Sequence, residues 1–279
     1  MTEIKPINIS ALMQKYQLKP KKSLGQNFLV DPQALERIID VADLDPETSV
    51  LEIGAGVGHL TRYLAARAGQ VTTVELDPRL IPPLQEVLEP YDNVRIVQGD
   101  ILELKPGDLM PDDRYLVVAN IPYYITSKII RDMLESRHKP IRMVLTVQYE
   151  VAQRICAVAG EMSVLALSVQ IYGEPYITSR IPASAFHPPP RVDSASIRVD
   201  LYPRPPLDTQ GRELFFRLIK AGFQHKRKTL RNSMAAGLGE KKADVEEMLQ
   251  QAGIDPQRRA ETLSLPEWIE LTKVYDKIN

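Results

Sequence analysis

The chain has 279 residues, 44% of them hydrophobic and 25% charged, and a formal net charge of −1. This composition is ordinary for a globular protein and leaves room for one large core and a second, smaller domain. The near-neutral charge gives no bulk sign of nucleic-acid binding, so any such partner must be met by a local basic patch.

Cysteine content and hydropathy limit the cellular compartments in which the protein is expected. The single cysteine, Cys156, excludes an internal disulfide and fits a reducing compartment. Residues 1–22 contain no apolar signal-peptide core, and no window approaches the roughly 18 apolar residues of a membrane span. We therefore expect a cytoplasmic protein with no membrane partner.

Helix and strand patterns alternate through the first half of the chain. Residues 34–44 have helical spacing, and Asp31-Pro32 before them provides an N-cap and a first-turn signal. Apolar runs then predict strands at 49–53, 71–74, 94–97, 115–119 and 143–147, with helices at 59–68, 79–88 and 127–136. This alternation predicts a mostly parallel sheet covered by helices on both faces.

The pattern changes in the second half. After a helical stretch at 162–172, strands are expected at 176–181 and 194–201, joined by a short Pro-rich turn that makes them antiparallel neighbours. The run Pro203-Arg204-Pro205-Pro206 indicates a linker, and the chain beyond it is helical, with a capping box at 264–267. We predict a domain over 1–203, with a basic N-terminal extension over 1–30, and a helical domain over 204–279.

A glycine-rich turn follows the first strand of the sheet. Gly54, Gly56 and Gly58 let the backbone turn tightly and approach a ligand without side-chain obstruction. A turn that merely packs well would explain a lone motif of this kind equally well. The spacing differs from the G-x-G-x-x-G of nicotinamide-binding dehydrogenases, which disfavours that class of enzyme.

Acidic residues stand at the ends of the next two strands. Glu75 could accept hydrogen bonds from both hydroxyls of a ribose, and Asp100 could accept from an adenine amino group while Ile101 covers the ring. Either acid alone is more often a solvated loop residue. Together with the glycines they occupy three consecutive strand ends, and this set predicts a site for S-adenosylmethionine.

The tetrapeptide Asn120-Ile121-Pro122-Tyr123 follows a buried strand, where open α/β sheets bind their ligands. The Asn120 side-chain oxygen and the Ile121 carbonyl could accept the two N6 hydrogens of adenine and favour the pyramidal nitrogen of a methyl-transfer transition state. Tyr123 would stack on the base. A plain strand-to-helix turn with a packed tyrosine is the alternative. Phe186, before three prolines, either completes a sandwich around the base or belongs to the core.

Basic residues are concentrated in two places. No acidic residue occurs between Leu214 and Gly239, and Lys21 and Lys22 belong to a second basic run near the amino terminus. One charge run is usually a solvated face, but two of them favour RNA contact. The expected RNA-binding residues are Lys21, Lys22, Arg217, Lys220, Lys226, Arg227, Lys228 and Arg231. The four histidines are scattered, so no metal site is expected.

Three segments together carry a family resemblance: Gly25-Gln26-Asn27-Phe28-Leu29, Asn120-Ile121-Pro122-Tyr123, and the run from Phe186 to Ala195. With them the chain resembles, over nearly its whole length, the small-subunit (16S) ribosomal RNA adenine N6-dimethyltransferases of the KsgA/RsmA type. The resemblance implies a Rossmann-like class I methyltransferase fold, α/β, with seven strands, mostly parallel and one antiparallel, and a small C-terminal α-helical domain.

The same resemblance implies the activity and its residues. The substrate would be two adjacent adenosines in the 3′-terminal hairpin loop of small-subunit rRNA, each dimethylated during ribosome biogenesis on a partly assembled subunit, by a monomeric enzyme. Catalytic residues would be Asn120, Ile121, Pro122, Tyr123 and Phe186. The cofactor S-adenosylmethionine would be bound by Asn27, Leu29, Gly54, Gly56, Glu75, Leu76, Asp100, Ile101 and Asn120.

Two segments depart from the family pattern. Tyr124 stands where many relatives have Asn, and residues 160–163 lack the Tyr-Gly-Arg-Leu-Ser sequence common there. Two rival functions stay open at this point. Large-subunit rRNA methyltransferases that confer macrolide resistance tend to be strongly basic, unlike this chain. A non-catalytic ribosome-assembly factor would not need the intact Asn120 and Tyr123.

Overall fold

The computed structural model describes residues 4–111 and 114–278, except for the side chain of Lys22. The chain forms two units. The first runs to Ala152 and includes Glu174–Leu201, and the second combines Gln153–Gly173 with the chain from Tyr202 onward. The second unit therefore includes residues 153–173, although the linker signal lies only at 203–206. Within the described part of the chain, no helix has the length and apolar character needed to cross a bilayer.

A seven-stranded sheet with the order β4-β3-β2-β5-β6-β9-β7 forms the centre of the first unit. Its strands are β2 (Ser49–Ile53), β3 (Gln70–Glu75), β4 (Val94–Gln98), β5 (Tyr115–Asn120), β6 (Arg142–Gln148), β7 (Gly173–Ile181) and β9 (Ser194–Leu201). Pairing is parallel from β4 to β6, and β9 is antiparallel to β6. The predicted sheet is thus confirmed, and the last two predicted strands are neighbours. Strand β2 is buried at every position, Ser49 and Glu52 included.

A second pairing joins two short segments that are far apart in sequence. Strand β1 (Phe28–Leu29) is antiparallel to β8 (Phe186–His187), with Leu29 opposite Phe186. This pairing brings the N-terminal segment against the Pro-rich turn. The sequence did not predict it, because two-residue strands have no readable periodicity.

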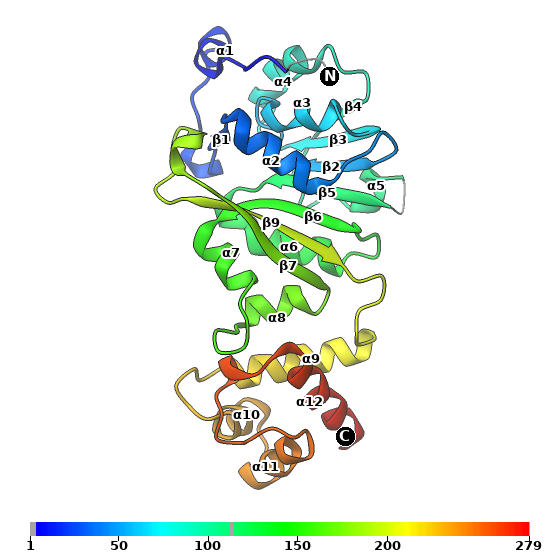
Figure 1. Ribbon diagram of the computed structural model, residues 1–279, viewed down its shortest axis with the longest axis vertical. Coiled ribbons are helices and arrows are strands. Elements are labelled where there is room, and N and C mark those ends of the chain that lie inside the picture. The colour runs from blue at the N-terminus through cyan, green and yellow to red at the C-terminus, as the bar shows by residue number, and fades with distance from the viewer. Residues whose placement is uncertain (1–3, 112–113, 279) are drawn as a thin grey trace. The chain divides into compact units, whose positions relative to one another are not determined.

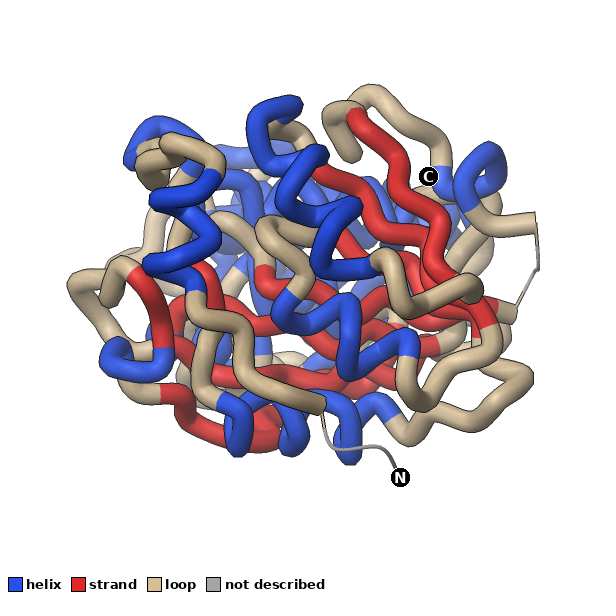
Figure 2. The backbone as a smooth tube through the Cα atoms, turned by 90° about the horizontal axis from the view of Figure 1, so that it is seen from above, coloured by secondary structure: helices blue, strands red, loops and turns tan. Residues whose placement is uncertain are grey.

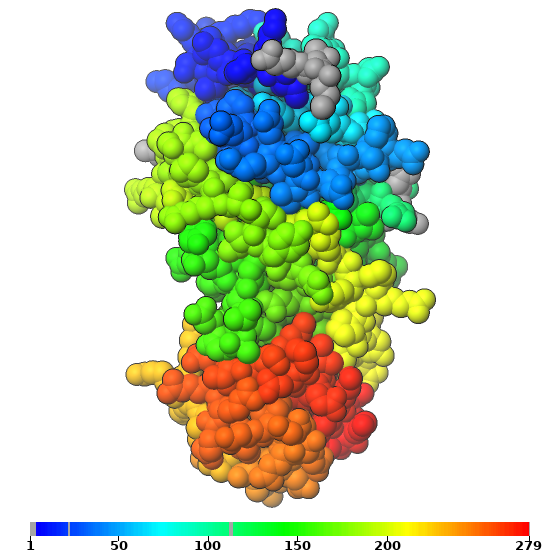
Figure 3. Space-filling view, in the orientation of Figure 1, coloured from blue at the N-terminus to red at the C-terminus, as the bar shows by residue number. Residues whose placement is uncertain are grey.

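Helices cover both faces of the sheet. In this unit they are α1 (Ile9–Lys15), α2 (Pro32–Ala42), α3 (His59–Ala65), α4 (Ile81–Leu88), α5 (Pro106–Leu109) and α6 (Thr126–Glu135), while α7 (Tyr149–Ile155) runs into the second unit. Helices α2 and α3 share one apolar cluster and lie in front of the sheet, with α6 behind it (Figure 1). Figure 2 shows the strands in red among the blue helices. In Figure 3 the blue residues of α2 lie on the side of the first unit that faces the viewer.

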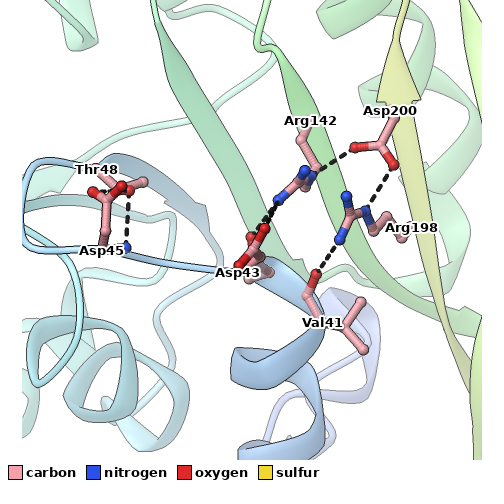
Figure 4. Close-up of polar contacts among 8 residues, drawn as sticks. Val41, Asp43, Asp45, Thr48, Arg142, Arg198 and Asp200 are labelled. Carbon is pink, nitrogen blue, oxygen red and sulfur yellow. Dashed lines mark hydrogen bonds and ion pairs between the residues drawn. The ribbon is translucent and has the colours of Figure 1, made fainter.

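Helix α2 is fixed at both ends by side chains. Asp31 Oδ1 accepts from the Ala34 amide at 2.7 Å, which confirms the predicted N-cap. At the other end Arg142 and Arg198 donate to the carbonyls of Ala42 and Val41, at 2.8 and 3.0 Å, and Asp200 accepts from both guanidinium groups (Figure 4). These bonds satisfy carbonyls that the helix leaves unpaired, and they tie α2 to β6 and β9.

The second unit is helical. It contains α8 (Val164–Gln170), α9 (Thr209–Phe223), α10 (Leu230–Leu238), α11 (Lys242–Gln251) and α12 (Leu265–Ile278). Trp268 is fully buried in its core. The predicted capping box is confirmed, since Glu267 Oε2 accepts from the Ser264 amide at 2.7 Å and from its hydroxyl at 2.8 Å.

Candidate active site

A cavity opens at the carboxyl ends of β2, β3, β4 and β5, where the sequence predicted the site. It has about 800 Å³ of space not filled by protein atoms, the solvent at its open mouth included. The predicted residues that line it are Asn27, Gly54, Gly56, Glu75, Leu76, Asp100, Ile101, Asn120, Ile121, Pro122, Tyr123 and Phe186. Leu29 is different: its side chain is 3% exposed and packs in the apolar cluster of α2 and α3.

The glycine-rich turn forms one wall of the cavity. Gly54 and Gly56 have φ values of 81° and 60°, in the left-handed region that favours glycine. A Cβ atom on Gly56 would lie 2.8 Å from Cδ1 of Phe28, so this backbone passes directly against the Phe28 ring. Both observations explain why glycine is needed at positions 54 and 56, where the backbone itself lines the cavity.

Glu75 presents a carboxylate with a fixed orientation. It is 6% exposed, its Oε2 accepts from the Gly56 amide at 2.8 Å, and its Oε1 accepts from the Asp77 amide at 2.8 Å. Burial raises its pKa. Each carboxylate oxygen can accept a second hydrogen bond. Two acceptors in one rigid plane suit the two hydroxyls of a ribose.

Glu52 is the penultimate residue of β2, two positions before Gly54 of the glycine-rich turn. Its Oε2 accepts from the hydroxyls of Thr61 on α3 and Thr73 on β3, at 2.6 and 2.7 Å. Burial raises its pKa to about 7. Sequence reasoning assigned Glu52 no role, although a lone acid within an apolar strand was a visible signal. The carboxyl group joins the strand, the helix and the neighbouring strand that hold the turn.

Asp77 holds the segment formed by residues 21–27, called here the N-terminal strap, against the end of β3. Its Oδ2 accepts from Gln26 Nε2 at 3.0 Å and from Arg79 at 2.6 Å, and Lys21 Nζ lies 3.8 Å from Oδ1. Hydrogen bonding by Arg79 is the main reason why its pKa falls to about 2. The sequence gave Asp77 no role, and nothing in it indicated the contact with Gln26.

The strap also orients Asn120. Asn120 Nδ2 donates to the Asn27 carbonyl at 3.1 Å. A carbonyl can only accept, so the amide nitrogen must face Asn27, and Oδ1 is left as the acceptor. The next residue is also held, because the Ile121 amide donates to the Thr146 carbonyl at 3.2 Å while its side chain is 1% exposed. Two acceptors, Asn120 Oδ1 and the Ile121 carbonyl, therefore have defined positions at the end of β5.

Two aromatic rings line the same cavity. The Tyr123 hydroxyl is 2.7 Å from Oγ of Ser194, a fully buried side chain, and burial raises the Tyr123 pKa. Phe186 is 3% exposed, belongs to the apolar cluster of α2 and α3, and also lines the cavity. Phe186 therefore belongs to the core, which was one of the two alternatives, and it also lines the cavity; the sandwich around a base stays a prediction.

The remaining lining fits an adenosine group. Asp100 Oδ1 accepts from the Leu102 amide at 2.9 Å, which fixes the carboxylate beside the cavity. Ile101 and Leu76 provide apolar side chains next to Asp100 and Glu75, and Leu76 is 40% exposed. Over residues 4–111 and 114–278, no three His, Cys, Asp or Glu side chains are grouped so as to hold a metal ion. Fixed carboxylates, apolar side chains and the exposed backbone of two glycines are groups that can recognise a nucleoside.

The predicted RNA-binding residues differ in their surroundings. Lys220, Lys226, Arg227 and Lys228 are exposed, the last three in the loop between α9 and α10. Arg231 instead pairs with Glu246 at 2.7 Å, and the exposed Arg217 lies over the Tyr275 ring, 5.6 Å from its centroid. Lys21 forms an ion pair with Asp77, and its side chain is 45% exposed. The Lys22 side chain lies outside the described part of the structure.

Sequence comparisons converge on one group of proteins. The family model described as "Ribosomal RNA adenine dimethylase" matches residues 17–277. A "Ribosomal RNA small subunit methyltransferase A" of Dehalococcoides mccartyi strain CBDB1 is 46% identical over 265 residues, covering 95% of this chain and 91% of the relative. The protein of the same name from Bacillus pumilus is 42% identical over 282 residues, covering 98% and 97%.

Solved structures share the architecture. A dimethyladenosine transferase from Plasmodium falciparum has a TM-score of 0.78 and 25% identity, over 90% of this chain and 98% of that one. The 23S rRNA methyltransferase ErmE has a TM-score of 0.75 and 31% identity, over 90% and 100%. The predicted class I methyltransferase fold with a helical C-terminal region is therefore confirmed.

Proposed function

The chain belongs to the ribosomal RNA adenine dimethylase family, and we propose that it transfers methyl groups from S-adenosylmethionine to N6 of adenosine in small-subunit rRNA. The observation that carries this proposal is the geometry at the end of β5. There the Asn27 carbonyl orients the Asn120 amide so that Oδ1 is left to accept, next to the Ile121 carbonyl. Two fixed acceptors match the two hydrogens of an exocyclic amino group.

Sequence identity favours RNA of the small ribosomal subunit, rather than of the large one, as the substrate. The methyltransferases named for the small subunit are 46% and 42% identical to this chain, against 31% for the 23S enzyme, although the fold of the latter is closely similar. The substrate would be the pair of adjacent adenosines in the 3′-terminal hairpin loop, each dimethylated on a partly assembled subunit in the cytoplasm. The enzyme would act as a monomer without a metal.

Different residues of the cavity would bind the methyl donor and the target adenine. When bound, S-adenosylmethionine supplies an electrophilic methyl group on sulfonium. Glu75 would hold its ribose, and Asp100 with Ile101 its adenine, while Asn27 lies beside Asn120. On the substrate side, Asn120 Oδ1 and the Ile121 carbonyl would accept the N6 hydrogens and favour a pyramidal nitrogen whose lone pair is no longer delocalised.

The aromatic residues would hold the target base. Tyr123 and Phe186 line one cavity, and the ring of an adenine removed from its stack would lie against them. Transfer gives a positively charged N6, which loses its proton readily to water, so the cavity needs no strong general base. An assembly factor without catalysis would have no use for this alignment of acceptors.

The test is labelled-methyl transfer to undermethylated small subunits, followed by mapping of the modified nucleosides. We expect label in N6,N6-dimethyladenosine at two adjacent positions. Large subunits serve as the specificity control. Label in the large subunit alone would support the rival methyltransferase class, and no label with firm subunit binding would support the assembly factor.

Asn120→Ala provides the matching variant. It removes one acceptor for the developing charge, so we expect kcat to fall roughly 100- to 1000-fold. The far-ultraviolet circular dichroism should be unchanged, because Asn120 is only partly buried and lies at a strand end. Unchanged turnover in a folded variant would contradict the role given to Asn120.

A further inference from the structure

Tyr124 is a large aromatic side chain that lines the cavity and yet is 58% exposed. It follows Tyr123 in the 3-10 helix formed by Tyr123–Ile125. Successive residues of such a helix point about 120° apart, which separates the two rings. Tyr123 is anchored inside through Ser194, and Tyr124 is left at the mouth.

One side of the Tyr124 ring is backed by main chain. A Cβ atom on Gly25 would lie 3.4 Å from Cδ1 and 3.5 Å from Cε1 of the ring, and Gly25 has a φ of 60°. The Gly25 backbone therefore approaches the ring without a side chain in between. The ring has a firm support on that side and an open surface elsewhere.

We propose that Tyr124 is a stacking platform for the unpaired base next to the target adenosine, a claim that rests on the proposed function. Taking one base out of a loop exposes the π-face of its neighbour, which then gains from a new aromatic partner. The Cα atoms of Tyr123 and Tyr124 are about 3.8 Å apart. A ring at position 124 is therefore within reach of the nucleotide adjacent to the one that Tyr123 holds.

The cavity allows one competing role, because Tyr124 shares it with the residues assigned to the methyl donor. A ring that only walls the donor would affect donor affinity. A stacking platform would affect RNA affinity and leave the donor alone. Equilibrium binding of each ligand separates these two roles, and it does so without any dependence on turnover.

The experiment compares Tyr124→Leu, which keeps apolar bulk, with Tyr124→Phe, which keeps the ring. Filter binding to undermethylated small subunits and calorimetry with S-adenosylmethionine give the two Kd values. We expect Tyr124→Leu to raise the subunit Kd about 10-fold, with the donor Kd unchanged and Tyr124→Phe near wild type. Tyr176→Leu is the control, because Tyr176 is 44% exposed but does not line the cavity.

Three results would overturn the platform: a subunit Kd unchanged in Tyr124→Leu, an equal loss in Tyr176→Leu, or a loss confined to the donor. The methyl-transfer assay on the same subunits keeps the proposals apart. Wild-type protein that binds subunits without labelling them would refute the proposed function, while the Kd comparison would still decide the role of Tyr124.

Discussion

Side chains assigned to the reaction are themselves held by hydrogen bonds from the backbone. Both oxygens of Glu75 accept amide hydrogens, and the Asn120 amide donates to the Asn27 carbonyl. Because these groups are fixed before a ligand arrives, little reorganisation is needed during the reaction. Tyr123 is held in another way, through its own hydroxyl.

The hydrogen bond between Tyr123 and Ser194 allows two contributions of Tyr123 to be measured apart: the presence of its ring and the position in which the bond holds that ring. Tyr123→Phe keeps the stacking surface and loses the bond to Ser194, so we expect a several-fold fall in kcat/KM. Tyr123→Ala loses the surface as well and should be far less active. Ser194→Ala removes the same bond from the other side and should match Tyr123→Phe. Equal losses for Phe and Ala in single-turnover assays would argue against stacking.

Sequence reasoning found the residues that are contiguous with a motif. Asn120, Ile121, Pro122 and Tyr123 stand together after an apolar strand, and all four line the cavity. Asp77 was missed because its decisive partner, Gln26, is far away in the chain. No local pattern identifies such a partner.

At the scale of elements, the N-terminal strap depends on one carboxylate. Asp77→Asn removes the charge that binds Arg79 and Gln26, and hydrogen bonds to charged groups are worth about 1.5–3 kcal/mol each. We expect the donor KM to rise about 10-fold, because Glu75 and Asn27 both depend on this region. Asp92→Asn, at an exposed acid, should have no effect. A donor KM equal to wild type would contradict the role of the strap.

Glu52 makes strand β2 sensitive to pH. Its pKa rises from 4.5 unfolded to about 7 folded, so between these values the folded state keeps a proton that the unfolded chain has released. Stability from this group is therefore lost as pH rises from 4.5 to 7, on the order of 3 kcal/mol. Glu52→Gln removes this dependence of stability on pH. The Tm of the variant minus the Tm of wild type should therefore increase between pH 5 and pH 8. A Tm difference that is flat over this range, as expected for exposed Glu103→Gln, would contradict the assignment.

Most strands of the sheet were predictable, and several helices were not. Strand β5 is buried at its first five positions, and its sequence there is a continuous apolar run, whereas β2 was recognisable from Val50, Leu51 and Ile53 although it also contains Ser49 and Glu52. Helices α1 and α7 were not predicted from the sequence, whereas α3 and α8, which also have seven residues, were. The pairing of β1 with β8 became visible only in three dimensions, because two-residue strands show no period.

On the scale of the whole molecule, an almost neutral chain must bind RNA through local charge. The loop between α9 and α10 presents Lys226, Arg227 and Lys228 to solvent. Changing all three to Glu should weaken subunit binding and flatten its dependence on salt, because fewer phosphate counterions are released. Donor affinity should not change.

A matched control lies in the same helical unit. Lys241, Lys242 and Lys277 are also exposed, and changing them to Glu alters the net charge equally. Titrations at several salt concentrations compare the two triple variants. Identical slopes would mean that total charge, rather than the loop, determines RNA affinity.

The pairing of β1 with β8 also has a consequence for the order of synthesis. The strand that carries Phe28 emerges from the ribosome early, yet its partner is made only after six strands of the central sheet. A nascent chain that ends after α6 would contain the glycine-rich turn, Glu75 and Asp100, but it would lack Phe186. We expect donor capture to begin late in translation, and stalled chains ending before and after residue 201 should differ in retained labelled donor.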